Sequence, residues 1–535
     1  MSGRGQPPRG RRGRRGRREE PPRAREAVEA LLRERLGFRG FKPALEVEAA
    51  RAAERAEQEP GGRRDLTALA TFTVDPASAR DFDDAVSAQR EGAGARVWVH
   101  IADVAAHVRP GSPLDLEARR RANSTYVPGA VEPMLPHALS SDACSLAPGV
   151  ERLAVTAEIE LGADGRPARS RFYRSRIRSD ARLDYDQLDA IFAGRARAPE
   201  EVAEPLAAAR DVAAALGEQR GTTSLDVESF EPEFRFDSRG NVTGAHGVAQ
   251  TEAHRLIERL MVMTNEQVAR LLAARRVPAV YRVHPQPDPP RIERLLEQLA
   301  ALGVPTPPLR GGLAPRAAGE LAAEASRLAR REAARRGHGR EAYTSLVLRS
   351  LKQAYYSERN SGHAGLGSEA YTHFTSPIRR YPDLLVHRAL LAALGEGEEA
   401  PKLREARDVA AECSARERES AQIERDADDV CAAYLLEREL AQRGLDARFE
   451  GEVSGVIRAG AFVGFAGELG DVYEGMLPTR RLPGERYELD RAEVALVGRG
   501  AGARTLRLGD PVALRVTGVA AEQGRVDLEL VEAEG

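Results

Sequence analysis

The pattern of apolar and polar residues changes period several times along the chain, and each change marks a change of predicted structure. Residues 25–36 and 44–58 are rich in Ala, Glu, Arg and Leu, which predicts two short helices. The apolar run 69–74 predicts a strand, and residues 85–88 begin another. Residues 96–104 alternate valine and isoleucine with other types, the pattern of a half-buried strand. The first hundred residues therefore predict two helices followed by part of a sheet.

From about residue 180 the pattern becomes helical. Residues 254–275 place apolar side chains at i, i+3 and i+4 spacing, which predicts a long buried helix whose methionines fill the core. Residues 314–336, 340–358 and 403–443 predict further helices. Another helix should start at Pro382 and run to about Leu394, with Gly395 as its stop. Proline suits the first helical turn, and glycine suits the position just after the last.

Short strands and glycines fill residues 447–532, and five or so strands in this length predict a small antiparallel barrel. Barrels of the OB type bind single strands through surface aromatic rings and a positive groove. Phe462 and Phe465 are the stacking candidates, although either ring could instead fill the barrel core. The predicted fold class is α+β: a large mixed domain, with a sheet core and many helices, followed by an OB-fold β-barrel.

Composition is ordinary for a globular protein, with 42 % hydrophobic and 30 % charged residues. No apolar run approaches the roughly 20 residues that a membrane helix needs, and no apolar segment follows the basic N-terminus as in a secretory signal. The three cysteines are odd in number and show no paired spacing: Cys144, Cys413 and Cys431. They predict reduced thiols in a cytoplasm, with neither a zinc site nor a disulfide frame.

The first eighteen residues carry eight arginines and no acid, interleaved with Gly and Pro. Such a composition cannot build a core, so residues 1–24 are predicted to be a disordered tail with affinity for polyanions such as RNA. A general surplus of arginine is the alternative explanation. It has force because Lys42, Lys352 and Lys402 are the only lysines in the sequence.

Four aspartates fall within ten residues, directly after the first predicted strand: Asp75, Asp81, Asp83 and Asp84. Like charges at about 4 Å repel by roughly 4 kcal/mol per pair at an effective dielectric near 20, so a fold that converges them needs a cation. Oxygen ligands of this kind favour Mg²⁺ or Mn²⁺, and pairs of such ions cleave phosphodiesters. The alternative is a set of turn residues at a solvated edge.

The spacing does not fit a calcium loop of the EF-hand kind, which needs a central glycine and a terminal glutamate. If the backbone is extended from Asp81 onward, Asp81 and Asp83 share one face and Asp84 points away. A bend at Pro76 would bring Asp75 back towards them.

A second cluster spans residues 375–383, where Arg379 and Arg380 precede the helix predicted from Pro382. Two guanidiniums beside a helix N-terminus are a natural seat for phosphate. Nearby aromatic residues could stack on unpaired bases: Tyr371, His373, Phe374 and Tyr381. An arginine pair on a solvated helix end is the plainer alternative. As lone histidines, His373 and His387 favour structural hydrogen bonds over metal binding.

Taken in order along the chain, these clusters resemble the RNase II and RNase R family of exoribonucleases, with RNase R the closer of the two. The matching segments are 73–85, 99–104, 126–136, 254–258, 281–284 and 365–383, within a catalytic domain of roughly residues 64–435. The terminal barrel looks like the OB-fold RNA-binding domain named after ribosomal protein S-one.

The resemblance implies roles for individual residues. Asp83 matches the family's most critical aspartate, and Asp75, Asp81 and Asp84 match metal ligands. Arg379 matches the arginine on the scissile phosphate, with Arg380 beside it, and Glu424 matches a glutamate near the reacting end. Tyr126 matches a ring that stacks on the 3′-terminal nucleotides. Either Tyr281 or Phe374 could be the second stacking ring of the family. Tyr381 is a further candidate for contact with RNA.

The implied activity is processive 3′-to-5′ hydrolysis of single-stranded RNA to nucleoside 5′-monophosphates, with Mg²⁺ or Mn²⁺, by a cytoplasmic monomer. The implied organisation is a basic tail (1–24), a short helical region (25–63), the catalytic domain (64–443) and the OB-fold domain (444–535). Family members usually carry two cold-shock barrels before the catalytic domain, whereas about 65 residues precede it in this sequence. A non-catalytic RNA-binding protein and a nuclease for single-stranded DNA are the alternatives.

Overall fold

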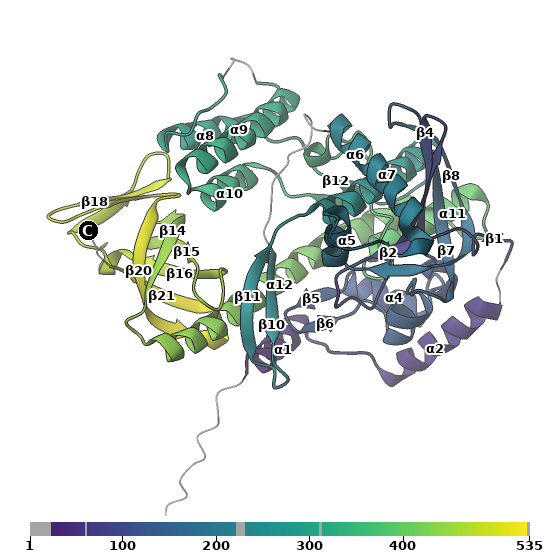
Figure 1. The fold of residues 1–535 in the computed structure, drawn as a ribbon, viewed down its shortest axis with the longest axis horizontal. Coiled ribbons are helices and arrows are strands. Elements are labelled where there is room, and N and C mark those ends of the chain that lie inside the picture. Colours follow the sequence, from purple (N-terminus) through teal and green to yellow (C-terminus); the bar gives the residue numbers. More distant parts are fainter. Residues whose placement is uncertain (1–22, 59–60, 221–230, 310–312, 532–535) are drawn as a thin grey trace, which may run out of the picture.

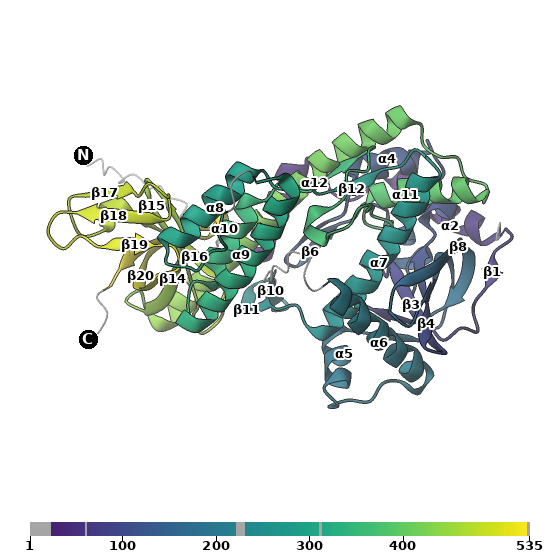
Figure 2. The same ribbon diagram turned by 90° about the horizontal axis from the view of Figure 1, so that it is seen from above.

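The computed structural model describes residues 23–58, 61–220, 231–309 and 313–531, so the predicted basic tail lies outside the described residues, apart from its last two positions. The described chain forms two lobes (Figures 1 and 2). One lobe is built on a sheet, and the other contains the C-terminal barrel and three helices beside it. Among the described residues, no helix is long and apolar enough to cross a membrane.

A seven-stranded sheet forms the centre of the first lobe, in the strand order β1–β8–β7–β4–β3–β2–β9. The pairs between β8 and β2 are antiparallel, whereas β1 and β9 add to the edges in parallel. The strands are Arg64–Asp65 (β1), Phe72–Val74 (β2), Asp84–Glu91 (β3), Gly94–Ala102 (β4), Glu151–Leu161 (β7), Pro167–Arg178 (β8) and Ala181–Leu183 (β9).

Helices cover this sheet, and α6 and α7 pack directly on its central strands. The helices of this lobe are Pro43–Gln58 (α2), Val104–His107 (α3), Pro113–Arg121 (α4), Tyr185–Phe192 (α5), Ala203–Arg220 (α6), Glu252–Ala274 (α7) and Tyr381–Leu394 (α11). The start of α11 beside Pro382 and its end at Gly395, which has a φ of 77°, confirm the helix boundaries predicted from the sequence.

In the described part of the chain, three further sheets have only two strands each. They pair Thr125–Val127 (β5) with Ala130–Glu132 (β6), Glu231–Phe236 (β10) with Val242–Val248 (β11), and Tyr281–Val283 (β12) with Tyr355–Ser357 (β13). Because β12 and β13 are far apart in sequence, their pairing closes a long excursion of the chain that contains the three helices of the second lobe.

The second lobe joins a helical group to a closed barrel. Helices Pro289–Ala301 (α8), Pro315–Arg336 (α9) and Arg340–Ser350 (α10) pack on one another, and α10 contacts the barrel. The barrel order is β14–β15–β16–β21–β20. Its strands are Arg448–Ile457 (β14), Gly460–Phe465 (β15), Tyr473–Pro478 (β16), Pro511–Ala520 (β20) and Arg525–Leu530 (β21); a meander of Arg486–Leu489 (β17), Ala495–Arg499 (β18) and Thr505–Arg507 (β19) is inserted.

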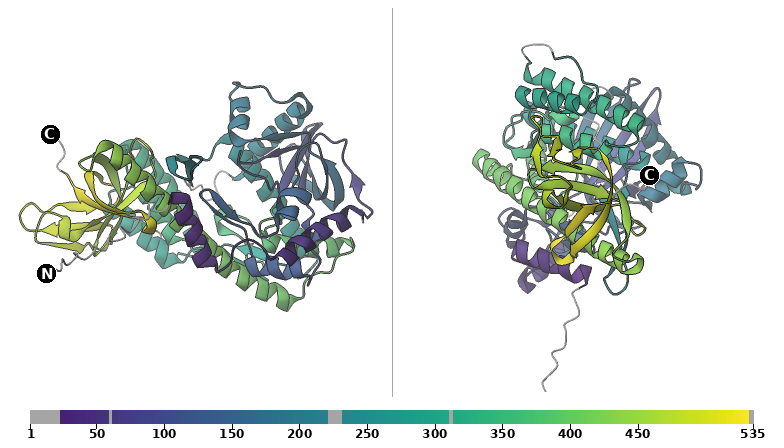
Figure 3. Two further views of the ribbon diagram at one scale, coloured as in Figure 1. Left: turned by 90° about the horizontal axis from the view of Figure 1, so that it is seen from below. Right: turned by 90° about the vertical axis from the view of Figure 1, so that its left-hand side faces the viewer.

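Helix α12, Leu403–Arg443, joins the two lobes. Its first part buries Ala406 and Cys413 in the core around the sheet, and its second part buries Ile423 and Leu436 in the core that includes the barrel. Helix α1, Ala24–Leu36, lies beside α12 (Figure 3). Because α12 packs in both cores, it holds the barrel at a defined place relative to the sheet.

Three details of the sequence-based fold were wrong. Strand β4 is buried on both faces, with Trp98 only 7 % exposed and His100 fully buried, because helices cover the sheet. Residues 340–358 are not one helix: α10 ends at Ser350 and the chain then forms β13. The barrel is not wholly antiparallel, because β16 and β21 pair in parallel.

Candidate active site

The acidic cluster lies where β2 ends and β3 begins. Asp75 directly follows β2, and its N–H donates to the carbonyl of Leu183 at 3.2 Å. The chain returns through a loop to Asp84, the first residue of β3. In that loop the N–H of Phe82 donates to Ser145 Oγ at 3.0 Å, and the carbonyl of Asp83 accepts from Ala102 N–H at 2.9 Å. The scaffold thus fixes the backbone of the cluster from several strands.

Asp83 is the most enclosed of the four aspartates, with 3 % of its surface exposed. Its Oδ1 accepts a hydrogen bond from Ile378 N–H at 2.8 Å, and its Oδ2 lies 3.2 Å from Nε of Arg379. The fold therefore joins two clusters that stand almost 300 residues apart in the sequence. Both predicted clusters belong to one site.

Burial raises the pKa values of three of these carboxyls, and repulsion from neighbouring carboxylates adds to the effect at two of the three. Burial raises the pKa of Asp83 to about 8, against the opposing effects of Arg379 and the Ile378 N–H. Burial also raises the pKa values of Asp75 and Asp84, and for Asp75 the charges of Asp84 and Asp83 add to the effect. Asp84 therefore lies near Asp75 and does not point away from the cluster as predicted, because β3 begins only at Asp84.

The donor set fits a hard divalent cation. Oδ2 of Asp75 is buried without a hydrogen-bond partner, and the clustered oxygens are of the kind that Mg²⁺ and Mn²⁺ prefer. In the part of the chain that the structure describes, no three His, Cys, Asp or Glu side chains already converge as a closed metal site. Arg379 instead partly neutralises the cluster by binding Asp83, and the neutral hydroxyl of Tyr126 donates a hydrogen bond to Asp81.

Tyr126 lies on β5 at the edge of this cluster and is 37 % exposed. Its hydroxyl donates to Oδ2 of Asp81 at 2.8 Å, and its N–H donates to Oε1 of Glu424 at 3.0 Å. Glu424 belongs to α12, so the long helix fixes the strand that carries this ring. The structure thus brings the hydroxyl of Tyr126 to the acidic cluster, and Glu424 binds the backbone of the same tyrosine.

Arg379 and Arg380 occupy different environments. The side chain of Arg379 is 47 % exposed although its Nε binds Asp83. Arg380 is mostly covered, and its Nη2 lies 2.7 Å from Oδ1 of Asp383 in the first turn of α11. Of the two side chains, that of Arg379 has the larger exposed fraction.

Most of the other predicted stacking rings lie in the core instead of at the surface. Tyr281 and Phe465 are 5 % exposed, Tyr381 is 1 % exposed and Phe374 is fully buried. Their apolar rings pack against neighbours, as when Phe374 stacks on His387 with ring centres 4.3 Å apart. In these positions the rings cannot stack on a base. Phe462 is only partly buried and packs against Gly455 in the barrel.

His373 and His387 form structural hydrogen bonds, as predicted. His373 Nδ1 lies 2.8 Å from the hydroxyl of Tyr356, and His387 Nε2 lies 2.8 Å from the carbonyl of Phe374. Burial lowers the pKa of both histidines, so both imidazoles are neutral near pH 7.

The structure adds Tyr185 to the site, which the sequence did not suggest. Its ring stacks on that of His254 with centres 3.9 Å apart. Burial raises the pKa of its hydroxyl, and the nearby charges of Asp84 and Asp75 raise it further. A tyrosine in the first turn of a helix carries no distinctive sequence signal, so only the fold shows that it lies beside the aspartates.

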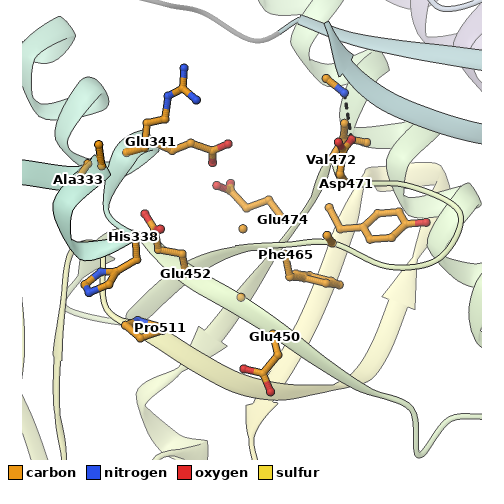
Figure 4. A pocket seen from close by; sticks show the side chains of 18 of the residues that line it. Ala333, His338, Glu341, Glu450, Glu452, Phe465, Asp471, Val472, Glu474 and Pro511 are labelled. Atoms are coloured by element: carbon orange, nitrogen blue, oxygen red, sulfur yellow. Dashed lines mark hydrogen bonds between the residues drawn. The ribbon is translucent and has the colours of Figure 1, made fainter. Parts of the chain in front are cut away.

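A large cavity lies elsewhere, between the barrel and helices α9 and α10. It has a volume of about 1270 Å³, and both arginines of α9 and several glutamates line it. Glu341, Glu452 and Glu474 point towards one another in its interior (Figure 4). Burial raises the pKa of Glu341 and of Glu452. None of the aspartates of the acidic cluster lines this cavity, so its size does not identify the active site.

The fold and the site define an RNB-type protein: a sheet that carries clustered aspartates against an arginine loop, followed by a small barrel. The model of the family described as "RNB domain" matches residues 63–396, and the chain belongs to this family. The resemblance inferred from the sequence is thereby confirmed.

Ribonuclease R of Escherichia coli K12 is 35 % identical over 498 residues, which cover 89 % of this chain and 58 % of that protein. Ribonuclease R of Aquifex aeolicus is 36 % identical over 502 residues, which cover 91 % and 67 %. The chain thus spans about three fifths of the length of several of these relatives.

Solved structures agree with this assignment. RNase R of Mycoplasma genitalium in complex with ribose-methylated single-stranded RNA matches with a TM-score of 0.85 and 28 % identity, over 94 % of this chain and 77 % of that one. Yeast Ssd1, described as a pseudonuclease, matches with a TM-score of 0.67 and 18 % identity, over 90 % of this chain and 59 % of that one. The second match shows the fold alone, so activity must be argued from the site.

Proposed function

We propose that the protein is a 3′-to-5′ exoribonuclease that hydrolyses single-stranded RNA processively to nucleoside 5′-monophosphates. The observation that carries the proposal is the direct contact of Asp83 with Arg379 and with the Ile378 N–H. This contact places a cationic group for phosphate beside a cluster of carboxylates. The ribonuclease R relatives support RNA as the substrate.

Asp75, Asp81, Asp83 and Asp84 would hold Mg²⁺ or Mn²⁺, which polarises the phosphate and lowers the pKa of an attacking water when bound. The unpartnered Oδ2 of Asp75 supports this assignment. Arg379 supplies a fixed positive charge where negative charge grows on the phosphate during cleavage. Its exposed guanidinium can approach an incoming phosphate while Nε stays on Asp83.

Tyr126 would stack on the 3′-terminal nucleotide, since its ring is exposed beside the aspartates. Glu424 acts on the site through the backbone of Tyr126, and Phe462 is the remaining stacking candidate on the barrel. We also propose that the protein acts as a monomer in the cytoplasm, where its three buried cysteines would remain reduced thiols.

The test is incubation with single-stranded RNA labelled at its 5′ end, with Mg²⁺ and, separately, with EDTA. The proposal predicts that the full-length labelled strand is converted to a short 5′-labelled remnant without a ladder of intermediates, and that unlabelled mononucleotides are released from the 3′ end; EDTA should abolish both. A DNA strand of the same sequence is the matched control and should be cut far more slowly. Tight RNA binding without shortening would refute the proposal and favour a non-catalytic role on the same fold.

A further inference from the structure

The loop that carries Arg379 is fixed by a residue that does not touch the acidic cluster. Asp383 is fully buried in the first turn of α11. Its Oδ1 accepts two hydrogen bonds, from the Ser376 N–H at 2.8 Å and from Arg380 Nη2 at 2.7 Å. One carboxylate oxygen therefore holds both ends of the turn 376–380.

Ser376 passes this constraint to Arg379. Its carbonyl accepts from Arg379 N–H at 3.3 Å and from Arg380 N–H at 3.0 Å, which closes the turn. Its hydroxyl accepts from Nη2 of Arg379 at 3.2 Å. Ser376 is only 3 % exposed, so water has little access to compete for these bonds. Asp383 thus fixes the position of Ser376, and the hydroxyl of Ser376 in turn holds Nη2 of Arg379.

Two of the three guanidinium nitrogens of Arg379 are held by the protein. Nε binds Asp83 and Nη2 binds Ser376, and these two contacts fix the plane of the group. Among the described residues, Nη1 has no hydrogen-bond acceptor, and almost half of the side chain is exposed. A guanidinium fixed on one edge can offer its remaining N–H groups to a phosphate with little loss of conformational entropy.

We propose that Asp383 and Ser376 are positioning residues that orient Arg379 for the reacting phosphate, with Arg380 as a brace of the same turn. This inference rests on the proposed function. It assigns Arg380 a different task from the RNA contact expected from the sequence, since its guanidinium is committed to Asp383. The two adjacent arginines then have separate tasks, one towards the substrate and one within the loop.

A double-mutant cycle tests the proposal. Ser376→Ala removes only the hydroxyl and should lower kcat by about 10- to 100-fold with KM changed less than about threefold, because orientation acts on the chemical step. Ser376→Thr keeps a hydroxyl and should recover most of the loss. In an Arg379→Ala background, Ser376→Ala should change kcat by less than about twofold. An equal loss in both backgrounds would overturn the proposal, since Ser376 would then not act through Arg379.

Asp383→Asn provides a second variant that keeps the size of the side chain and one acceptor oxygen. Its expected loss in kcat is within about tenfold and should also vanish in the Arg379→Ala background. Arg380→Ala tests the brace: the slope of RNA affinity against salt concentration should stay unchanged, whereas a phosphate contact would reduce that slope by about one. A reduced slope would overturn the assignment of Arg380.

A structural measurement separates this inference from the proposed function. In crystals of the Ser376→Ala variant, the guanidinium of Arg379 should leave the place it occupies in the wild type. An unmoved guanidinium would overturn the positioning role, whether or not the protein cleaves RNA. A wild type that releases no nucleotides would refute only the proposed function.

Discussion

Replacing Asp83 by asparagine should stabilise the metal-free protein while abolishing hydrolysis. The Asp83 carboxyl is almost completely buried, and burial raises its pKa to about 8. In the unfolded chain the same carboxyl titrates near 3.9. Near neutral pH the metal-free protein must therefore take up a proton at Asp83 when it folds, and asparagine, which is neutral, avoids this requirement.

The size of the effect depends on pH. The contribution of a carboxyl whose pKa is raised by folding is fully present below the pKa of the unfolded chain. As pH rises from that value towards the pKa of the folded protein, the free energy of unfolding falls by ~1.4 kcal/mol per pH unit. Between pH 5 and pH 8 we expect a change of ~2 kcal/mol, about half of the ~4 kcal/mol that the full shift gives, because an effective dielectric near 20 reduces the penalty of burying the charge. Asparagine keeps a neutral oxygen acceptor for Arg379, as the protonated carboxyl does, so the bond from Arg379 changes this difference little.

Urea unfolding of both proteins in EDTA, at pH 5 and pH 8, measures this difference. The free energy of unfolding of Asp83→Asn, relative to wild type, should rise by about 2 kcal/mol between the two pH values, with an unchanged denaturant slope. The same variant should release no mononucleotides in Mg²⁺ while it still binds RNA. A pH-independent difference in stability would refute the account of the buried carboxyl, and near-normal turnover would refute its role in catalysis.

Three further predictions concern the metal, the arginine and the ring. Mg²⁺ should raise the melting temperature more at pH 8.5 than at pH 6, because the ion competes with protons at Asp75 and Asp84; an equal shift would contradict this. Arg379→Lys keeps the charge but loses the planar contacts and should lower kcat at least about tenfold in nucleotide-release assays. Tyr126→Ala should weaken RNA binding by about 1–3 kcal/mol in titrations, whereas Tyr126→Phe should bind nearly as well as wild type.

The sequence predicted several helices correctly because the residues that mark each helix lie within it or directly beside it. Pro382 and Gly395 mark the boundaries of α11, and the pattern of residues 403–443 matches α12. The hairpin of β10 and β11 went unpredicted, and the end of α10 was placed too late. Strand β4 was predicted to be half-buried because alternation indicates one covered face, whereas the burial of Trp98 and His100 as well as Val97 and Val99 shows that both faces are covered.

The site likewise has features that the local sequence predicts and features that depend on contacts between distant segments. Four aspartates close together in sequence could be recognised as a cluster from their spacing and mutual repulsion. Their contact with Arg379 depends on the tertiary fold and was reached only through the family resemblance. The burial of Phe374 and the place of Tyr185 beside the acids follow from packing between distant segments. A residue's type gives its possible chemistry, while its exposure decides whether that chemistry is available.

The account rests on a carboxylate cluster that binds divalent ions beside Arg379. Crystals grown with Mn²⁺, and measured at a wavelength where manganese scatters anomalously, test it most directly. We expect an anomalous peak from a manganese ion bound by oxygens of Asp75 and Asp83. The peak should be lost in crystals of the Asp75→Asn variant. Crystals in which these carboxylates contact only protein donors, with no peak among them at millimolar Mn²⁺, would contradict the account.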